Sequence, residues 1–195
     1  MRHHIEEDGE YQLLLDEIAT EFSDFEIIQK SESKLMKTID VLLRIITFNQ
    51  MKTFMVHFVT TMGNKVYVPS SWSNWSTTAK WILLNHERVH MRQAKKYGRF
   101  LFSFMYLLVP VPLLFAYCRM KFEQEAYTVS LECQHEAFGA EALLNPEDKE
   151  WMIKHFTTGQ YFWMWVYRPT IEKWYDKTVK RIIQENELFP DELEK

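Results

Sequence analysis

The stretch "WILLNHERVHMRQAKKYG", residues 81 to 98, places two histidines four positions apart, with a glutamate directly after the first. Positions i and i+4 of an α-helix lie on one face with Cβ atoms about 5–6 Å apart, so His86 and His90 can direct ring nitrogens at one metal ion. Glu87 is turned about a quarter of a circle to the side, where its carboxylate can reach a water molecule at the metal without binding the ion. The spacing therefore predicts two metal ligands and a base within one helical turn.

The residues around this motif favour a buried helix over a surface turn with two titrating histidines. Four apolar residues, Trp81 to Leu84, precede it and would anchor the helix in a core. Ser76 or Thr77 is a good N-cap and Gly98 is a good stop signal, so we expect the helix to end at Tyr97. Such a pentapeptide also arises by chance in roughly a few per cent of similar chains. Assigning a metal centre therefore requires a third ligand elsewhere in the chain.

A catalytic zinc ion usually has three protein ligands and one open position. The candidates downstream of the motif are Glu123, Glu125, His135 and His155. In "FEQEAY" a helical conformation places Glu123 and Tyr127 on one face, whereas Glu125 points roughly the opposite way. His135 begins a second H-E pair, but Gly139 stands where the next histidine would be needed. We expect His135 at the surface, and Glu123, Glu125 and His155 remain candidates for the third ligand.

The spacing of these motifs resembles that of the gluzincin group of zinc metallopeptidases. In that group an H-E-x-x-H helix is followed by a separate helix whose glutamate is the third ligand, as "HERVH" is followed here by "EQEAY". The longer run "TTMGNKVYVP…W…HERVHMRQ…YG…FEQEAY" is similar to small bacterial and phage gluzincin-like proteins. The resemblance covers about residues 50 to 130. It implies a zincin-like fold with an active-site helix and a glutamate helix.

The resemblance also implies an activity, a zinc-dependent peptidase that acts on peptides or proteins. The Zn2+ ligands that it implies are His86, His90 and Glu123. Glu87 would be the general base for a metal-activated water and would pass the proton to the leaving amine. An extended substrate would pair along the edge of the strand "KVYVP".

Other residues would support this chemistry. Tyr127 and Gln93 would hold the ligands through hydrogen bonds, although many gluzincins carry an aspartate where this chain has Tyr127. For the group that steadies the oxyanion, Tyr161 is the first choice and His155 the second. For both side chains, a place in the aromatic core or at its rim is the favoured interpretation over a catalytic role.

The rest of the pattern predicts an α+β fold with a small, mostly antiparallel sheet. We expect a single zincin-like domain over residues 1–195, with an N-terminal part (1–50), a metallopeptidase core (51–165) and a C-terminal helix (166–195). "FEIIQK" reads as a strand, and "KTFMVHFVTTMGNKVYVPSSW" reads as two strands joined at Met62-Gly63-Asn64. Pro69 after the second strand suits a position at or near a sheet edge.

Helices are expected on both sides of these strands. Their approximate ranges are 13–22, 33–48, 76–97, 119–138, 145–156 and 169–187. For the second of these, Ser31 or Ser33 is the expected N-cap. Its apolar face is predicted to consist of Leu35, Ile39, Leu42, Leu43 and Ile46.

The composition excludes several functional classes. Of the 195 residues, 47% are hydrophobic and 15% aromatic, which argues against disorder. The net charge of −4 does not indicate the excess of positive charge that is typical of proteins that bind nucleic acid. Cys118 and Cys133 form no metal or disulfide pattern, and the N-terminus lacks the apolar region of a secretory signal. We therefore expect a cytoplasmic protein with free thiols.

One apolar run leaves a membrane contact open. "FLFSFMYLLVPVPLLFAYC", residues 100–118, contains no charged residue and is just long enough to cross a bilayer. Pro110 and Pro112 would break a helix near its middle, which favours a buried apolar hairpin over a membrane-embedded segment.

The sequence leaves two alternatives to a cytoplasmic peptidase. One is a membrane-associated metallopeptidase that uses the run 100–118. The other is a non-enzymatic, gluzincin-like structural or assembly protein, for example a virion component, that retains a metal site. The intact H-E-x-x-H motif favours activity, because a structural role does not require Glu87 beside two ligands.

Overall fold

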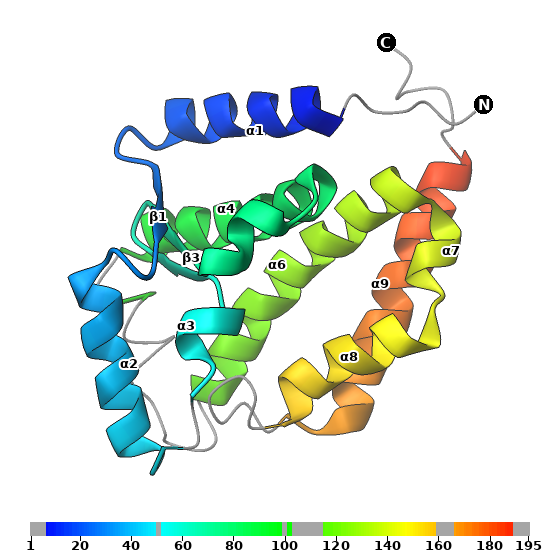
Figure 1. The fold of residues 1–195 in the computed structure, drawn as a ribbon. Helices are drawn as coiled ribbons and strands as arrows, with labels where there is room; N and C mark the ends of the chain where they lie inside the picture. Colours follow the sequence, from blue (N-terminus) through cyan, green and yellow to red (C-terminus); the bar gives the residue numbers. More distant parts are fainter. Residues whose placement is uncertain (1–6, 50–51, 99–100, 103–114, 159–165, 189–195) are drawn as a thin grey trace. The chain divides into compact units, whose positions relative to one another are not determined.

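The computed structural model describes residues 7–49, 52–98, 101–102, 115–158 and 166–188. The chain divides into two compact units, residues 1–91 and 92–195. The first unit contains α1 (Glu7–Glu21), β1 (Glu26–Gln29), α2 (Lys34–Ile46), α3 (Phe54–His57), β2 (Thr60–Met62), β3 (Lys65–Val68), the short 3-10 helix η1 (Ser70–Asn74) and most of α4 (Thr77–Tyr97). The second contains the end of α4 and then α6 (Phe115–Phe138), α7 (Ala140–Leu143), α8 (Pro146–Thr157) and α9 (Arg168–Leu188) (Figure 1). The described residues thus confirm the α+β class.

The sheet has three strands in the order β1-β3-β2. β2 pairs with β3 in the antiparallel orientation, and β1 pairs with β3 in the parallel orientation. The expected mostly antiparallel sheet is therefore wrong, because α2 and α3 form a crossover that brings β1 alongside β3 in the same direction. The position of β3 is also corrected: "KVYV" is the central strand, so a peptide cannot pair along it as predicted. Pro69 lies just past its paired residues and leaves the ladder intact.

The segment before β2 also differs from the predicted strand. Residues Phe54–His57 form one helical turn, α3, in which the N–H of His57 donates to the Thr53 carbonyl at 2.9 Å. Phe54 is buried, and its carbonyl accepts a hydrogen bond from Lys30 Nζ at 2.9 Å. These tertiary contacts outweigh the β propensity of the segment. The predicted turn at Gly63, with φ +64°, does join β2 to β3.

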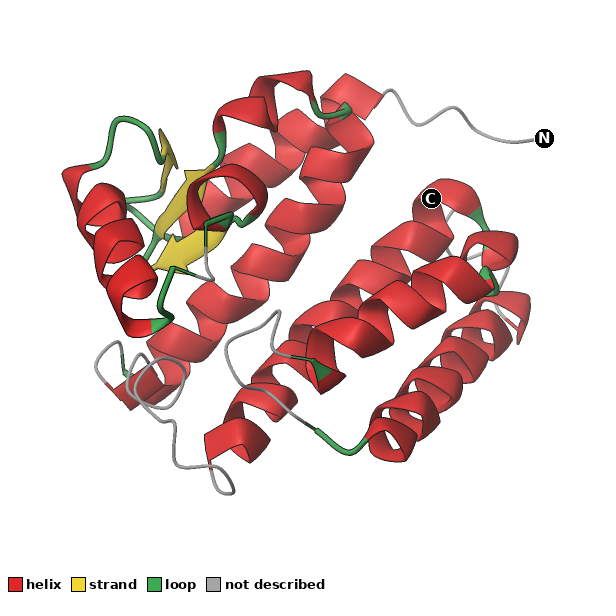
Figure 2. Ribbon diagram, turned by 60° about the horizontal axis from the view of Figure 1, so that its bottom comes forward, coloured by secondary structure: helices red, strands yellow, loops and turns green. Residues whose placement is uncertain are grey.

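The two faces of the sheet pack against different helices, which Figure 2 shows on both sides of the strands. Successive side chains of a strand point to opposite faces. Val66 and Val68 pack with Leu84 and Met91 of α4 and with the apolar side of α1. Tyr67, between them, packs instead with α2 and α3. The sheet therefore supports the helix that carries the histidine pair.

Helix α2 forms where predicted, but a different face of it is buried. Ser33 is the N-cap, and its hydroxyl accepts from the N–H of Met36 at 3.2 Å. Met36 is fully buried and packs with the partly buried Leu43. Leu35 and Leu42, which were predicted on the buried face, are exposed. An apolar periodicity cannot say which of two apolar faces points inward.

The described part of the second unit is helical, and its helices confirm the last three predicted ranges. Their core includes Leu131, Ile153, Phe156, Ile171 and Ile182. The Asn145 side chain caps α8 by accepting from the N–H of Glu147 at 2.9 Å, as its sequence signal predicts. Both cysteines are free thiols.

Two predictions fall largely or wholly on residues that the structure does not describe. Most of the apolar run 100–118 lies outside the described residues, and so does Tyr161. Within the described ranges, none of the helices combines the length and the apolar character needed to cross a bilayer.

Candidate metal centre

Helix α4 holds both histidines of the motif near its middle. The Ser76 hydroxyl accepts from the N–H of Ala79 at 3.2 Å at the start of the helix. The helix ends at Tyr97, and the next residue, Gly98, has φ +84°, the left-handed conformation that favours glycine after a helix. Both predicted ends are therefore confirmed.

The rotation of α4 about its axis is fixed by contacts on the side away from the histidines. Arg88 lies two residues after His86, about 200° around the helix. It forms ion pairs with Glu17 and Glu21 of α1, at 2.6 and 2.8 Å. Packing and ion pairs on that side hold the histidine face turned away from α1.

His86 and His90 are both buried, and their Nε2 atoms lie 3.1 Å apart. Burial, together with the neighbouring His90, holds the pKa of His86 well below its usual value. His86 is therefore neutral at neutral pH, and a neutral imidazole is the form that binds metals.

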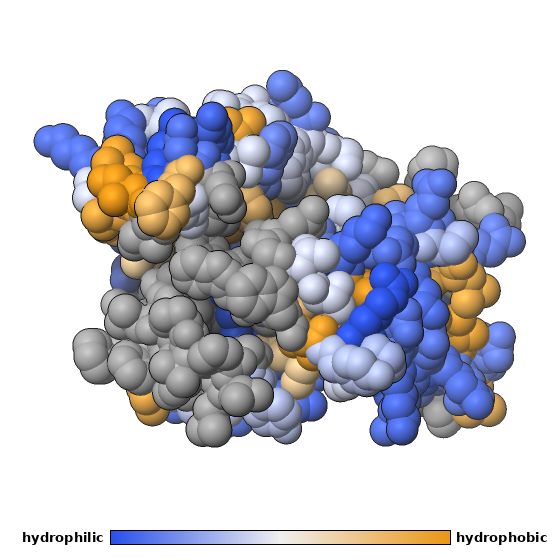
Figure 3. Space-filling view, turned by 90° about the horizontal axis from the view of Figure 1, so that it is seen from below, coloured by the Kyte–Doolittle hydropathy of each residue, from blue (hydrophilic) through white to orange (hydrophobic). Residues whose placement is uncertain are grey.

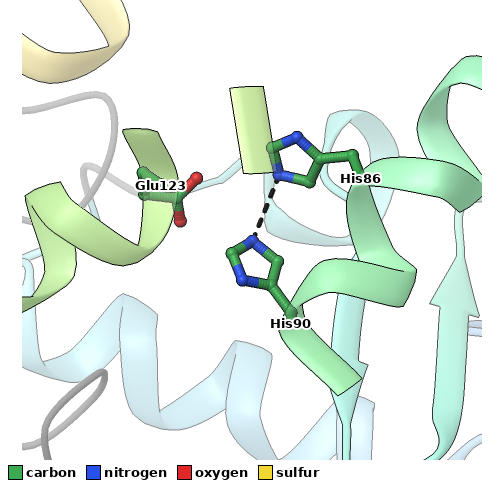
Figure 4. Close-up of side chains that lie close together, drawn as sticks. All are labelled: His86, His90 and Glu123. Carbon is green, nitrogen blue, oxygen red and sulfur yellow. Dashed lines mark hydrogen bonds between the residues drawn. The ribbon is translucent and has the colours of Figure 1, made fainter. Parts of the chain in front are cut away.

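The structure brings the predicted third ligand to this pair. Glu123 of α6 is buried, and one ligand atom from each of His86, His90 and Glu123 lies within 4.8 Å of the others. Figure 4 shows the three side chains directed toward one another. Ligand bonds of 2.0–2.2 Å around a tetrahedral zinc ion separate ligand atoms by about 3.4 Å. The histidine nitrogens already meet this spacing, and two imidazoles with one carboxylate are a donor set of catalytic zinc sites.

A buried glutamine fixes α6 beside α4 close to Glu123. Gln93 Nε2 donates to the Phe122 carbonyl at 3.1 Å and to Glu125 Oε2 at 2.8 Å. Gln93 thus links α4 to the residue before Glu123. Glu125 lies outside the metal group, as expected, but it accepts this hydrogen bond. Its contact was not predicted, because spacing along a helix shows only which way a residue points.

Tyr127 and His155 lie in the same helical unit as Glu123. Tyr127 is buried, with its ring centroid 6.5 Å from that of His155 and 5.4 Å from that of Phe156. Burial lowers the pKa of His155, while the Trp151 carbonyl, 2.8 Å from Nδ1, and the charge of Glu123 act in the opposite direction. His155, the second choice for an oxyanion group, is thus an electrostatic neighbour of the third ligand.

A buried lysine near Glu87 has no counterpart in the predictions. Lys30 is fully buried, with Nζ 3.6 Å from the centroid of the Phe54 ring. Burial lowers the pKa of Lys30 to about 7, against the opposing influence of Glu87 and Asp40. Its position at the end of "FEIIQK" carries no signal of burial, because a terminal lysine of a strand is normally solvated.

No protein-family model matches the chain, and no similar protein was found among curated proteins or solved structures. The likeness to gluzincins therefore rests on the motifs of the sequence. The geometry of His86, His90 and Glu123 supports a metal centre on its own terms.

Proposed function

We propose that this protein is a zinc-dependent peptidase of the gluzincin type with a zincin-like fold. The observation that carries the proposal is the buried group of His86, His90 and Glu123, whose ligand atoms lie within 4.8 Å of one another. Glu87 follows the first ligand directly and is buried on the same helix. A structural metal site would not require an acid at that position, so the pattern favours hydrolysis.

Zinc, when bound, would polarise the scissile carbonyl of a peptide and lower the pKa of the attacking water. The chain's part begins with its ligands. The two neutral imidazoles would supply lone pairs, and the Glu123 carboxylate would supply a negative charge that balances part of the charge of the ion. Burial of these three groups strengthens each electrostatic interaction among them, and the fourth position is left for the attacking water.

Glu87 is the proposed general base and acid. Its carboxylate would take a proton from the attacking water and deliver it to the nitrogen of the leaving amine. Lys30 and Glu87 interact electrostatically: burial lowers the pKa of Lys30 to about 7, and Glu87 acts in the opposite direction.

His155 is the proposed source of oxyanion stabilisation among the described residues. The Trp151 carbonyl lies 2.8 Å from its Nδ1 and can accept the proton of that nitrogen. A doubly protonated ring would then have Nε2–H available for a developing oxyanion. Burial acts against this protonated form by lowering the pKa of His155, whereas the Trp151 carbonyl and the charge of Glu123 act in its favour.

The test compares Glu87→Gln with the wild-type protein in two measurements. Elemental analysis should find about one zinc per chain in both, because Glu87 is not a ligand. Cleavage of a broad library of quenched fluorescent peptides should fall by about 100-fold to 10,000-fold in the variant. Loss of zinc from the variant would contradict the role of Glu87 as a base. A wild-type protein that holds zinc but cleaves nothing would favour the structural or assembly role.

A further inference from the structure

The outward side of α2 is apolar in addition to its buried side. Leu35, Val41, Leu42 and Ile45 are 46%, 56%, 51% and 67% exposed. With 100° per residue, these four positions fall within a sector about 120° wide, opposite the buried Met36. The exposed Lys34 and Thr38 lie in the same sector, and exposed apolar side chains grouped in this way mark a contact surface.

Phe48 extends this surface past the end of the helix. It is 90% exposed and adopts φ +48°, and the next residue, Asn49, has φ +63°. Their N–H groups donate to the carbonyls of Ile45 and Arg44 and close the helix. Glycine is the usual residue in such a left-handed position. The chain therefore holds an aromatic ring out from the surface in a conformation that is unfavourable for phenylalanine.

Positive charge is concentrated around the same helix. Residues 33–53 contain four cations, Lys34, Lys37, Arg44 and Lys52, whereas the chain as a whole carries −4. Asp40, the only acid among them, is largely buried and pairs with Arg44 at 2.8 Å. On the helix, Lys37 and Arg44 border one side of the apolar sector. The stretch is thus a basic, apolar surface on an otherwise acidic chain.

We propose that this outer face of α2, formed by Leu35, Val41, Leu42, Ile45 and Phe48, binds the surface of an anionic membrane. Apolar side chains bordered by lysine and arginine are the pattern of helices that lie in the headgroup region, where the cations meet lipid phosphates. Figure 3 shows apolar residues in orange at the surface on the side where Figure 1 places α2. A partner without negative charge would not require the basic border.

The length of α2 defines the mode of binding. Its 13 residues extend over about 20 Å, which is shorter than the roughly 30 Å of bilayer hydrocarbon. The helix therefore lies along the membrane surface and does not cross it. This contact is independent of the apolar run 100–118 and of the proposed peptidase activity.

The test is flotation of the full-length protein with lipid vesicles. Vesicles of phosphatidylcholine with added phosphatidylglycerol should carry the protein at low salt, and pure phosphatidylcholine or high salt should release most of it. Ile45→Glu and Phe48→Ser should each lower the bound fraction at least tenfold. Leu144→Glu, at a residue 65% exposed that follows α7 directly, should leave it unchanged.

Three outcomes would overturn the proposal. The first is a wild-type protein that floats with neither kind of vesicle. The second is full binding by Ile45→Glu, which would assign the contact to another segment such as residues 100–118. The third is a lipid-free dimer in light scattering that Ile45→Glu converts to a monomer, which would assign the face to a second copy of the chain. Circular dichroism shows whether Ile45→Glu is folded. If it is not, Phe48→Ser and Lys37→Glu, at an exposed residue, replace it in the test. Both should bind anionic vesicles more weakly than the wild-type protein.

Discussion

Helices α4 and α2 depart in opposite directions from the rule that polar residues face water and apolar residues face the core. α4 buries His86, Glu87, His90 and Gln93, whereas α2 exposes leucine, valine and isoleucine along its outer side. Each departure costs stability unless something compensates for it. For α4 the structure describes hydrogen bonds and a candidate metal-ligand group, and for α2 it describes a basic border. The comparison teaches that buried polar and exposed apolar side chains mark candidate sites on these two helices.

The largest expected effect concerns Glu123, the candidate ligand that lies close to the buried histidines of α4. Glu123→Gln should weaken zinc binding more than 100-fold, because it removes a ligand, whereas Glu125→Gln should weaken it tenfold at most. A competition titration against a zinc chelator measures both. Equal losses from the two variants would mean that α6 is turned differently from the described helix. No loss from either would remove Glu123 from the ligand set and point to His155.

A smaller effect is expected from the link between α4 and α6. Gln93→Ala should lower zinc affinity by about 10-fold to 100-fold, because it frees α6 from its hydrogen bonds next to Glu123. Glu125→Ala removes one of the same bonds, so the double variant should lose less than the two single losses combined. The same chelator titration gives all three values. Strict additivity would show that the Gln93–Glu125 contact does not position the ligand.

The buried cation near α4 should appear in the pH dependence of stability. Because the folded-state pKa of Lys30 is lowered to about 7 from 10.5, the unfolded chain binds more protons between these values. The free energy of unfolding should therefore rise by up to about 1.4 kcal/mol per pH unit as pH increases from 7 to 10.5. Urea denaturation should find this contribution lost in Lys30→Met and retained in the exposed Lys37→Met. A Lys30→Met protein with the wild-type slope would show that Lys30 is charged in the folded state.

The smallest expected effect concerns the exposed apolar side of α2. Ile45→Ser should change the free energy of unfolding by no more than about 0.5 kcal/mol, because the side chain is already in solvent. Met36→Ala, on the buried side of the same helix, should cost about 2–5 kcal/mol. Thermal or urea denaturation compares the two. A cost above 1 kcal/mol for Ile45→Ser, in the range of core substitutions, would mean that this face is covered within the protein.

Features that depend on nearby residues were predictable from the sequence. The caps at Ser33, Asn145 and Gly98 follow from local backbone geometry, and the shared face of His86 and His90 follows from helical spacing. The position of Glu123 came from a resemblance between motifs, because spacing alone left several candidates.

Features that depend on distant contacts were not predictable in the same way. The central place of β3 is decided by the path of the chain through α2 and α3, and no residue of "KVYV" encodes it. The turn α3 replaces a predicted strand because Phe54 meets Lys30, which lies 24 positions earlier. The outward face of α2 was misassigned because both of its sides are apolar.

The parallel pairing of β1 with β3 has a consequence for how the chain folds. Glu26 is paired with Lys65, so the whole of α2 and α3 must be enclosed before this ladder can form. Closing a long loop costs chain entropy before any contact is gained, whereas the β2–β3 hairpin closes locally within microseconds. We expect β1 to join late, after an intermediate in which one edge of β3 is open to pairing with other chains. At high protein concentration, this open edge would pair with other chains and cause aggregation. The sheet that supports α4 and its histidines would then not be completed.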